Sequence, residues 1–562
     1  MNTEQHFKNL LKLIKIEREE EKIQLAEIIG KHSVHDRVKQ GLTWYPLHIH
    51  DWYFDKAERL VVEVEQNQKS LVNSEFGTGR LVSFFTNQQA VNDNQNVTGV
   101  ITSMRGNQAK VVLNCDDMPD WFRMGKLGMD LLYDETSFKE MKLALEQLLT
   151  LERGRTKELV EILLGERKPN FSSKEVAQVQ SLNQSQNLAL QNAIHAQDIA
   201  IIHGPPGTGK TTTLIEVIKE LLVENSQILV CAPSNNAVDL LVEKLYKASI
   251  KVLRIGNPAR INQHIQDFSL SQQVSQHPDF GLIKKMKRQS QEFRNMASKY
   301  KRQFGHAERQ QRKALYDEAW KLQKEAFAIE DYISESLIEG TQVIACTLVG
   351  AANISIKDRK YPVCVIDEAS QALEPACWIP ILRSDKVIMA GDHQQLPPTV
   401  KSNEADKLGL SVSLFEQCMQ QLDVDVMLST QYRMNKKIMQ YSSQVFYNNQ
   451  LEASETIAEH HLGVADLPIF EFVDTAGCGF DEEAGKAGNT KTSLQNSHEA
   501  DLLFKHLFGL YEHLEANKIN WKNLSCGIIS PYKGQVEYIK ELLEDFPFAS
   551  KNMSVNTVDG FQ

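Results

Sequence analysis

The feature that most constrains this chain is the run Gly-Pro-Pro-Gly-Thr-Gly-Lys-Thr-Thr at residues 204–212, directly after the apolar run 199–202. A loop of the form G-x-x-x-x-G-K-T between a buried strand and a helix is typical of phosphate binding. Its backbone N–H groups face phosphate oxygens, its lysine reaches the β- and γ-phosphates, and its threonine hydroxyl can ligate Mg²⁺. The helix that follows favours anions at its N-terminus.

The alternative for this loop is a glycine-rich turn that binds nothing, but such a turn needs no strand, lysine, threonine and helix in this order. The sequence therefore predicts a site for a nucleoside triphosphate with Mg²⁺. We expect it to be formed by Gly204, Pro205, Pro206, Gly207, Thr208, Gly209, Lys210, Thr211 and Thr212.

The size and composition of the chain set broader limits. A chain of 562 residues is expected to form roughly three or four domains. A formal net charge of −11 argues against a uniformly basic coat, though not against a local basic groove. Eight scattered cysteines without a C-x-x-C pair favour a reducing, cytoplasmic compartment. No apolar run is long enough to predict a membrane span.

The N-terminal third alternates between helical and strand-like patterns. Residues 4–29 predict an amphipathic helix, residues 41–135 a small β-barrel, and residues 137–151 a second helix. The two helices are expected to pack together as a stalk beside the barrel. We therefore predict an accessory domain over residues 1–181.

From residue 186 onward, apolar strands alternate with helices, which is typical of a parallel α/β sheet. The predicted strands are 198–203, 227–232, 341–347, 363–367 and 386–390, and a second α/β stretch follows with strands 426–429, 468–473, 525–530 and 553–558.

A helical insertion over residues 262–336 interrupts the first α/β stretch. Two interpretations stay open for its basic segment: an arm that contacts nucleic-acid phosphates, or a solvated helical hairpin. The basic residues are Lys284, Lys285, Lys287, Arg288, Arg294, Lys299, Lys301, Arg302, Arg309, Arg312 and Lys313.

Two adjacent carboxylates, Asp367 and Glu368, follow the fourth predicted strand. Carboxylates at the end of a buried strand are costly unless they bind or react with something. Asp367 suits Mg²⁺ coordination and Glu368 suits polarising an attacking water. The alternative is a helix N-terminus enriched in acids.

Two further polar runs follow. Residues 391–398 read Gly-Asp-His-Gln-Gln-Leu-Pro-Pro and can sense a γ-phosphate, with Pro397 and Pro398 as a rigid platform for a base. Residues 431–434 read Gln-Tyr-Arg-Met, and an arginine placed there can reach a phosphate in a cleft between two domains. Such an arginine accelerates phosphoryl transfer by about 10³- to 10⁵-fold.

Taken in order, these runs resemble superfamily 1 helicases over residues 182–562. The resemblance is to the group that contains the nonsense-mediated-decay helicase and the immunoglobulin-mu-binding helicase. It also rests on Leu182 to Gln186, the run APSNNAVD at 232–239, SPYKGQ at 530–535 and VNTVDGFQ at 555–562. It implies two RecA-like domains, 182–424 and 425–562, with ATP between them, and 5′ to 3′ movement along single-stranded DNA or RNA.

The resemblance also implies roles for individual residues. Gln186 would read adenine with Tyr432 stacked near it, and Gln395 and Arg433 would contact the γ-phosphate. The nucleic-acid track would be formed by small polar or rigid groups suited to contacts without sequence readout. These are Pro233, Ser234, Asn235, Thr347, Pro397, Pro398 and Thr557.

The sequence ends at Gln562, inside a family motif and before the motif that carries a second catalytic arginine. Two explanations of this end stay open: the sequence is a fragment, or the protein is a truncated relative. In either case we expect an incomplete second domain, and a chain that binds ATP with severely reduced turnover. The alternative function is then an ATP-gated module that binds single-stranded nucleic acid. A protein remodeller or a small-molecule kinase would not need the runs at 391–398 and 431–434. We expect a monomer.

Overall fold

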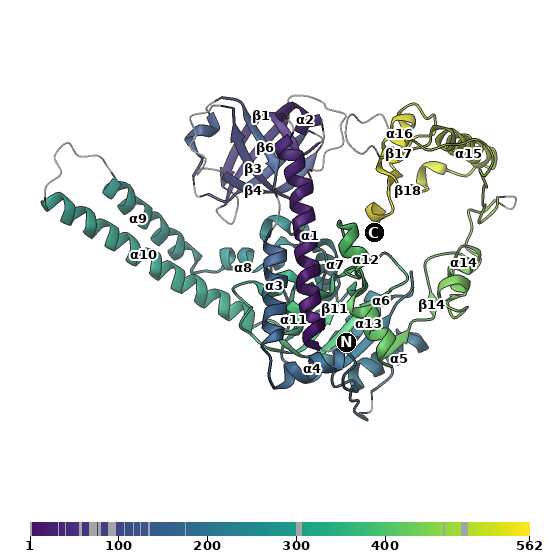
Figure 1. Ribbon diagram of the computed structural model, residues 1–562, viewed down its shortest axis with the longest axis horizontal. Helices are drawn as coiled ribbons and strands as arrows, with labels where there is room; N and C mark the ends of the chain where they lie inside the picture. The colour runs from purple at the N-terminus through teal and green to yellow at the C-terminus, as the bar shows by residue number, and fades with distance from the viewer. Residues whose placement is uncertain are drawn as a thin grey trace.

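The computed structural model describes residues 3–561 except 32, 40, 55–58, 67–75, 77–79, 88–96, 106, 116, 124, 133–134, 175, 299–305, 465–466 and 485–492. Among the helices so described, none has the length and apolar character to cross a bilayer. The elements form an N-terminal barrel with flanking helices, a large parallel sheet with a helical hairpin, and a set of smaller C-terminal sheets (Figure 1).

The predicted barrel is confirmed, and it is closed, with strand order β1-β2-β5-β4-β3-β6. Its interior contains side chains such as Val62, Phe84, Ile101 and Met129. The pairing of β1 with β6 closes the barrel. The elements here are α2 (Val34–Lys39), β1 (Thr43–Phe54), β2 (Leu60–Gln66), β3 (Leu81–Thr86), β4 (Val97–Arg105), β5 (Gln108–Leu113) and β6 (Leu127–Leu131).

The helices that flank the barrel, α1 (Thr3–Lys31) and α3 (Glu135–Leu149), pack on each other and on the large α/β domain. Phe7 of α1 lies edge-to-face against Trp378 at 5.4 Å between ring centroids. Glu17 accepts hydrogen bonds from the backbone N–H groups of Lys401 at 2.7 Å and Ser402 at 2.9 Å. The first half of α1 is therefore fastened to the domain that holds the phosphate loop.

The large sheet has seven strands in the order β13-β7-β12-β11-β8-β10-β9, and every neighbouring pair is parallel. Its strands are β7 (Ile199–His203), β8 (Ile228–Ala232), β9 (Val252–Arg254), β10 (Val343–Thr347), β11 (Tyr361–Ile366), β12 (Ser384–Gly391) and β13 (Asp425–Met427). The accompanying helices are α4 (Arg155–Leu163), α5 (Gln184–His195), α6 (Lys210–Glu224), α7 (Asn235–Lys247), α11 (Glu374–Ile381), α12 (Asn403–Lys407) and α13 (Leu414–Gln421).

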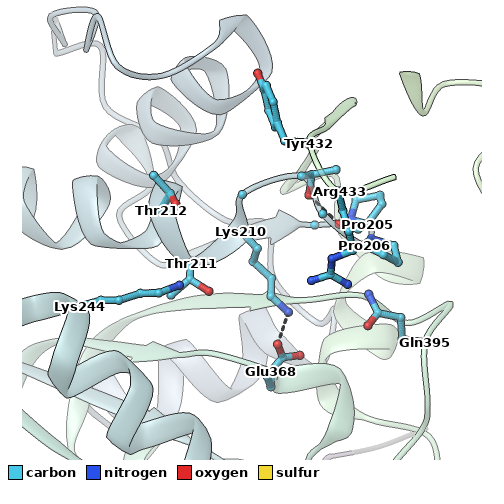
Figure 2. A pocket seen from close by; sticks show the side chains of 14 residues that line it. Pro205, Pro206, Lys210, Thr211, Thr212, Lys244, Glu368, Gln395, Tyr432 and Arg433 are labelled. Atoms are coloured by element: carbon cyan, nitrogen blue, oxygen red, sulfur yellow. Dashed lines mark hydrogen bonds and ion pairs between the residues drawn. The ribbon is translucent and has the colours of Figure 1, made fainter. Parts of the chain in front are cut away.

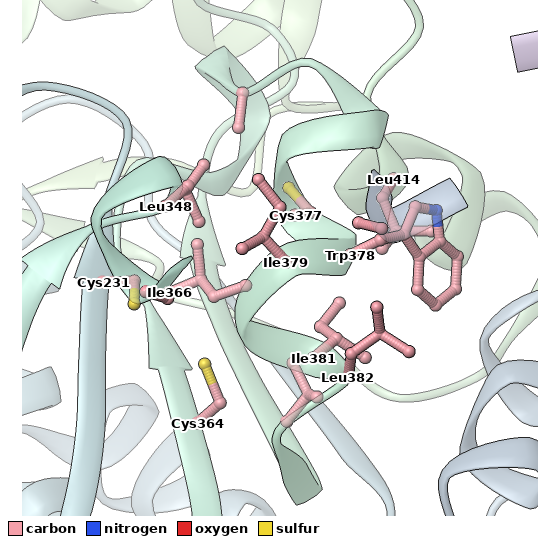
Figure 3. Close-up of a cluster of buried hydrophobic side chains, with 14 of the residues drawn as sticks. Cys231, Leu348, Cys364, Ile366, Cys377, Trp378, Ile379, Ile381, Leu382 and Leu414 are labelled. Atoms are coloured by element: carbon pink, nitrogen blue, oxygen red, sulfur yellow. The ribbon is translucent and has the colours of Figure 1, made fainter. Parts of the chain in front are cut away.

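Both faces of this sheet are buried, which explains why its strands read as unbroken apolar runs. Successive residues of one strand enter opposite cores: Ile366 belongs to one cluster and Val365 to the other. Figure 3 shows part of the first cluster, in which Ile366 and Cys364 of β11 lie on one side of α11 and Trp378 lies on its other side near Leu414. This packing holds the carboxyl ends of the strands in place.

Two strands differ from the sequence-based expectation. Strand β9 was not predicted, because it is only three residues long and gives no recognisable apolar run; all three residues pair with β10. Strand β13, expected to open the second domain, pairs instead with β7 at the edge of the large sheet. The N–H of Leu428 donates to the His203 carbonyl at 2.8 Å and continues this pairing. The chain thus leaves the large sheet a few residues after the predicted division at 425.

The insertion is helical, as predicted, and consists of α8 (Leu270–Gln276), α9 (Phe280–Ser298) and α10 (His306–Glu339). Figure 1 shows α9 and α10 projecting together away from the sheet. Small and apolar side chains, among them Ile283, Ala326 and Ile333, pack between these helices. Of the basic segment, Lys299, Lys301 and Arg302 lie outside the described residues.

The C-terminal region contains three two-stranded sheets among its described residues. The predicted strand 468–473 is wrong: this segment forms no strand, and Phe470 and Phe472 are exposed, so no sheet face buries them. The elements are β14 (Thr430–Gln431), α14 (Lys436–Phe446), β15 (Glu452–Ala453), β16 (Glu483–Ala484), β17 (Leu494–Gln495), α15 (Ser497–Ala516), β18 (Cys526–Ser530), α16 (Lys533–Glu544) and β19 (Met553–Thr557).

Candidate nucleotide-binding site

The loop at 204–209 leaves β7 and enters α6, as the sequence predicts. Gly207 and Gly209 have φ angles of 79° and 80°, a left-handed conformation that favours glycine. The space around them is also closed to a side chain. A Cβ on Gly207 would lie 2.5 Å from Arg433 Cβ, and one on Gly209 would lie 2.6 Å from Gln186 Nε2. The loop is thus packed between Gln186 on one side and the Arg433 segment on the other.

A cavity of about 420 Å³ opens over this loop. Figure 2 shows that side chains from both α/β regions surround it. Its lining comprises Gly204, Pro205, Pro206, Gly207, Thr208, Gly209, Lys210, Thr211, Thr212, Lys244, Glu368, Gln395, Tyr432 and Arg433. The structure therefore brings the whole predicted loop together with the water-polarising candidate, the two γ-phosphate candidates and one of the two adenine candidates, Tyr432.

Lys210 and Glu368 form an ion pair, with 2.6 Å between Lys210 Nζ and Glu368 Oε1. A phosphate oxygen bound by Lys210 would therefore lie beside the Glu368 carboxylate, where a water could be positioned for attack. Glu368 has a φ of 52°, which is uncommon for a residue with a side chain. Such strained residues concentrate at functional sites.

Asp367 directly follows β11 and is only 4% exposed. Burial raises the pKa of its carboxyl group, the charge of Lys210 opposes that rise, and the charge of Glu368 adds to it. A bound cation would stabilise the ionised form of a carboxylate in such a place. Oxygen ligands suit Mg²⁺, and the Asp367 carboxylate with the hydroxyl of Thr211, the residue after Lys210, would supply them. The donor set therefore fits the predicted metal, although Asp367 itself lies behind the cavity wall.

The two adenine candidates are placed differently. Tyr432 lines the cavity, and its backbone N–H donates to the Gly207 carbonyl at 2.8 Å. Gln186 is buried beneath the loop, where its Nε2 donates to the Thr208 carbonyl at 2.9 Å and its Oε1 accepts from the Asn183 N–H at 3.0 Å. These contacts give Gln186 a part in shaping the loop. Its contact with adenine stays a prediction.

Arg433 is held by the turn that precedes α14. Its backbone N–H donates to Gln431 Oε1 at 2.8 Å, and Gln431 Nε2 donates to the Met434 carbonyl at 2.7 Å. Figure 2 shows the guanidinium group pointing into the same space as Lys210 and Gln395. The side-chain amide of Gln395 donates to Asp392 Oδ2 at 2.7 Å. Three groups suited to a γ-phosphate thus converge.

Lys244 was missed by the sequence analysis. It lies on α7 and lines the cavity from the side opposite Arg433 (Figure 2). Its charge also acts on Asp367, where it favours the ionised carboxylate. In the sequence it is one of several lysines on an amphipathic helix, so no local signal marks it.

The proposed nucleic-acid residues are only partly brought together. Strands β8 and β10 are neighbours, with Thr347 opposite Ala232, so residues 233–235 and Thr347 lie together at the carboxyl edge. Pro397 and Pro398 follow β12 at the same edge. Thr557 ends β19, which belongs to the separate β18–β19 sheet. Their role stays a prediction.

Arg254, another residue that the sequence analysis passed over, holds part of this edge. It is fully buried, and its Nε donates to Asp239 Oδ1 at 2.9 Å while its Nη2 donates to Asn235 Oδ1 at 2.8 Å. The side chain of Ser234 caps α7 by accepting from the Ala237 N–H at 3.1 Å. The 234–235 segment is therefore fixed by a buried ion pair and a helix cap.

Comparison with known proteins agrees with this geometry. Two family models, each described as an AAA domain, match residues 181–403 and 410–562. DNA polymerase alpha-associated DNA helicase A of Schizosaccharomyces pombe is 31% identical over 521 residues, which cover 88% of this chain and 76% of that protein. The chain belongs to the superfamily 1 helicases.

Within superfamily 1, two further relatives place the chain in the group identified from its sequence. DNA-binding protein SMUBP-2 of Rattus norvegicus is 32% identical over 521 residues, covering 88% of this chain and 50% of that protein. ATP-dependent helicase upf1 of Schizosaccharomyces pombe is 30% identical over 463 residues, covering 77% and 46%. This superfamily 1 member spans about half the length of these two relatives.

Proposed function

We propose that this superfamily 1 member hydrolyses ATP in order to move along single-stranded DNA or RNA and to separate strands, in the 5′ to 3′ direction. The observation that carries the proposal is the composition of the cavity. Its phosphate loop and Glu368 belong to the domain of the large sheet, whereas Tyr432 and Arg433 belong to the segment that leaves it. A nucleotide bound there would touch both regions.

The side chains suggest how hydrolysis proceeds. Glu368 would accept a proton from a water molecule, whose oxygen attacks the γ-phosphorus as the bond to the β–γ bridging oxygen breaks. Lys210 and Arg433 would stabilise the negative charge on the transferred phosphoryl group, which is the main need of this reaction. Thr211 and Asp367 would hold Mg²⁺, which neutralises phosphate charge when bound.

A nucleic-acid strand would be contacted at the carboxyl edge of the large sheet. Residues 233–235 and Thr347 are adjacent there and offer small polar groups, which suit phosphate contacts without sequence readout. Motion along the strand would follow from a change in the spacing of the two regions as ATP is bound and hydrolysed.

The names of the relatives support this assignment: one is a DNA-binding protein, and two are helicases. All eight cysteines are free thiols in the structure, which supports a reducing compartment such as the cytoplasm. We propose a monomer as the working unit.

The test is ATP hydrolysis by this chain with and without single-stranded DNA or RNA, followed by strand displacement on duplexes with 5′ or 3′ tails. We expect the single strand to stimulate hydrolysis and only the 5′-tailed duplex to open. Hydrolysis that no single strand stimulates would contradict the proposal, and opening of only 3′-tailed duplexes would contradict its polarity.

A further inference from the structure

A buried carboxylate beneath the cavity joins the γ-phosphate candidate Gln395 to a tyrosine at the end of α14. Asp392 follows β12 and is 1% exposed. Its Oδ2 accepts two hydrogen bonds of 2.7 Å, one from Gln395 Nε2 and one from the Tyr447 hydroxyl. Its Oδ1 lies 3.1 Å from His203 Nε2 and accepts from the Gln394 N–H at 3.1 Å. Both oxygens of the carboxylate are therefore held by hydrogen bonds to neighbouring residues.

The carboxylate is ionised at neutral pH. Burial alone would raise the pKa of Asp392, but hydrogen bonds from His203, Gln395 and Tyr447 hold it below its usual value. An ionised carboxylate accepts hydrogen bonds more strongly than a neutral acceptor does. The link from Tyr447 through Asp392 to Gln395 is thus made of charge-assisted hydrogen bonds.

The direction of Gln395 follows from this link. A side-chain amide nitrogen carries two hydrogens, and one of those on Gln395 is donated to Asp392. The amide plane is then fixed, and Gln395 keeps its place in the cavity wall with its second N–H still available. Anything that turns the Asp392 carboxylate will turn this donor.

Tyr447 belongs to the C-terminal region, so its contact with Asp392 depends on where that region lies. It caps α14 at its C-terminal end, whereas Arg433 lies three residues before α14 begins. Its ring is 4% exposed and packs with Met439 and Leu451, also outside the large sheet. One helix therefore reaches the phosphate machinery at both ends: Arg433 directly and Tyr447 through Asp392.

We propose that Tyr447 is a positioning residue that aligns Gln395 with the γ-phosphate only when α14 is seated against Asp392. The cavity would then distinguish ATP from ADP partly by the position of the C-terminal region. This inference rests on the proposed function in taking the cavity as an ATP site. It adds a residue outside the recognised motif runs.

The test is the affinity of the full chain for a non-hydrolysable ATP analogue relative to ADP, with Mg²⁺ and without nucleic acid. Tyr447→Phe removes one hydroxyl oxygen and leaves the ring in place. We expect it to lower the preference for the triphosphate about fivefold to tenfold, the scale of one typical hydrogen bond, because the effect reaches the phosphate only through Asp392 and Gln395, while ADP affinity changes less than about twofold. Tyr441→Phe is the matched control, because Tyr441 lies on the same helix and is 66% exposed; it should change nothing.

To distinguish positioning of Gln395 from a merely structural role of Tyr447, the Tyr447→Phe substitution is repeated in a chain that also carries Gln395→Ala. The inference predicts that Tyr447→Phe then has no further effect on the preference. It is overturned if Tyr447→Phe keeps the wild-type preference, or if the loss is the same size with and without Gln395. Because the readout needs neither turnover nor nucleic acid, it can succeed even if single strands fail to stimulate hydrolysis. A wild-type chain without any triphosphate preference would contradict this inference but not the proposed function, which depends on hydrolysis and not on a difference in binding between ATP and ADP.

Discussion

The two α/β regions of this chain differ in the size of their sheets and in how much of each sheet is buried. Residues 182–428 form a seven-stranded parallel sheet buried on both faces. The described part of residues 430–561 forms two-stranded sheets around a smaller aromatic core with Trp521 and Phe546. The predicted phosphate loop and the predicted water-polarising residue Glu368 come from the first region, whereas the second supplies Tyr432 and the γ-phosphate candidate Arg433.

This difference suggests that the large sheet holds the reacting groups in place and that the second region is the part that moves. Preorganised charges need a frame that does not relax when they are brought together, and the large sheet provides one. Arg433 and Tyr447 bracket a single helix, α14, so a small displacement of that helix moves both. The second region is thus suited to change position with the bound nucleotide, whereas the first region is suited to carry out the hydrolysis.

Glu368→Gln should give the largest effect, because it removes the group that accepts the proton within the rigid region. We expect single-turnover hydrolysis to fall about 10³-fold while ATP affinity is kept. Rapid-quench assays and nucleotide binding measure the two separately. Glu404→Gln, on the exposed surface of α12, is the control, and hydrolysis that survives in Glu368→Gln would remove the proposed base.

Arg254→Ala tests the rigidity of the large sheet itself. It leaves Asp239 buried without its ion partner, so we expect the free energy of unfolding to fall by about 3–5 kcal/mol. Chemical denaturation measures it, with Arg288→Ala on the exposed face of α9 as the control. Equal losses in the two variants would show that the buried pair does not stabilise the edge that carries Asn235.

These contacts show which parts of the molecule were visible in the sequence. The loop at 204–212 and the pair Asp367 and Glu368 were predictable, because a phosphate site needs those residues in that order beside apolar strands. Lys244 and Arg254 were not, since their roles depend on neighbours distant in the chain. Residues 468–473 looked like a strand because they form a largely apolar, aromatic run, yet such a run forms a strand only where a partner edge and a core are present.

Lys386 tests the first region through pH. Burial lowers its pKa to about 8, so folding opposes its charged form below that pH, and this cost is relieved as pH rises from about 8 toward 10.5, its ordinary value. Lys386→Met should therefore raise the free energy of unfolding by about 1–2 kcal/mol at pH 7, allowing for partial solvent screening. The gain should shrink above pH 8. A gain equal to that of the exposed Lys407→Met, or one independent of pH, would contradict this account.

Phe546→Leu tests whether the second region melts by itself. Loss of ring contacts in the small aromatic core should cost about 1 kcal/mol. Because that core shares no buried residue with the two cores of the large sheet, calorimetry should show one transition lowered and the other unchanged. A single transition that shifts as a whole would mean that the two regions unfold together.

The central claim is that one nucleotide is held by both regions, and Arg433→Ala tests it most directly. The substitution leaves the phosphate loop and both carboxylates intact. Single-turnover hydrolysis of saturating ATP should fall about 10³-fold, with ADP affinity unchanged. Hydrolysis at the wild-type rate would show that the first region works alone and would contradict the shared site.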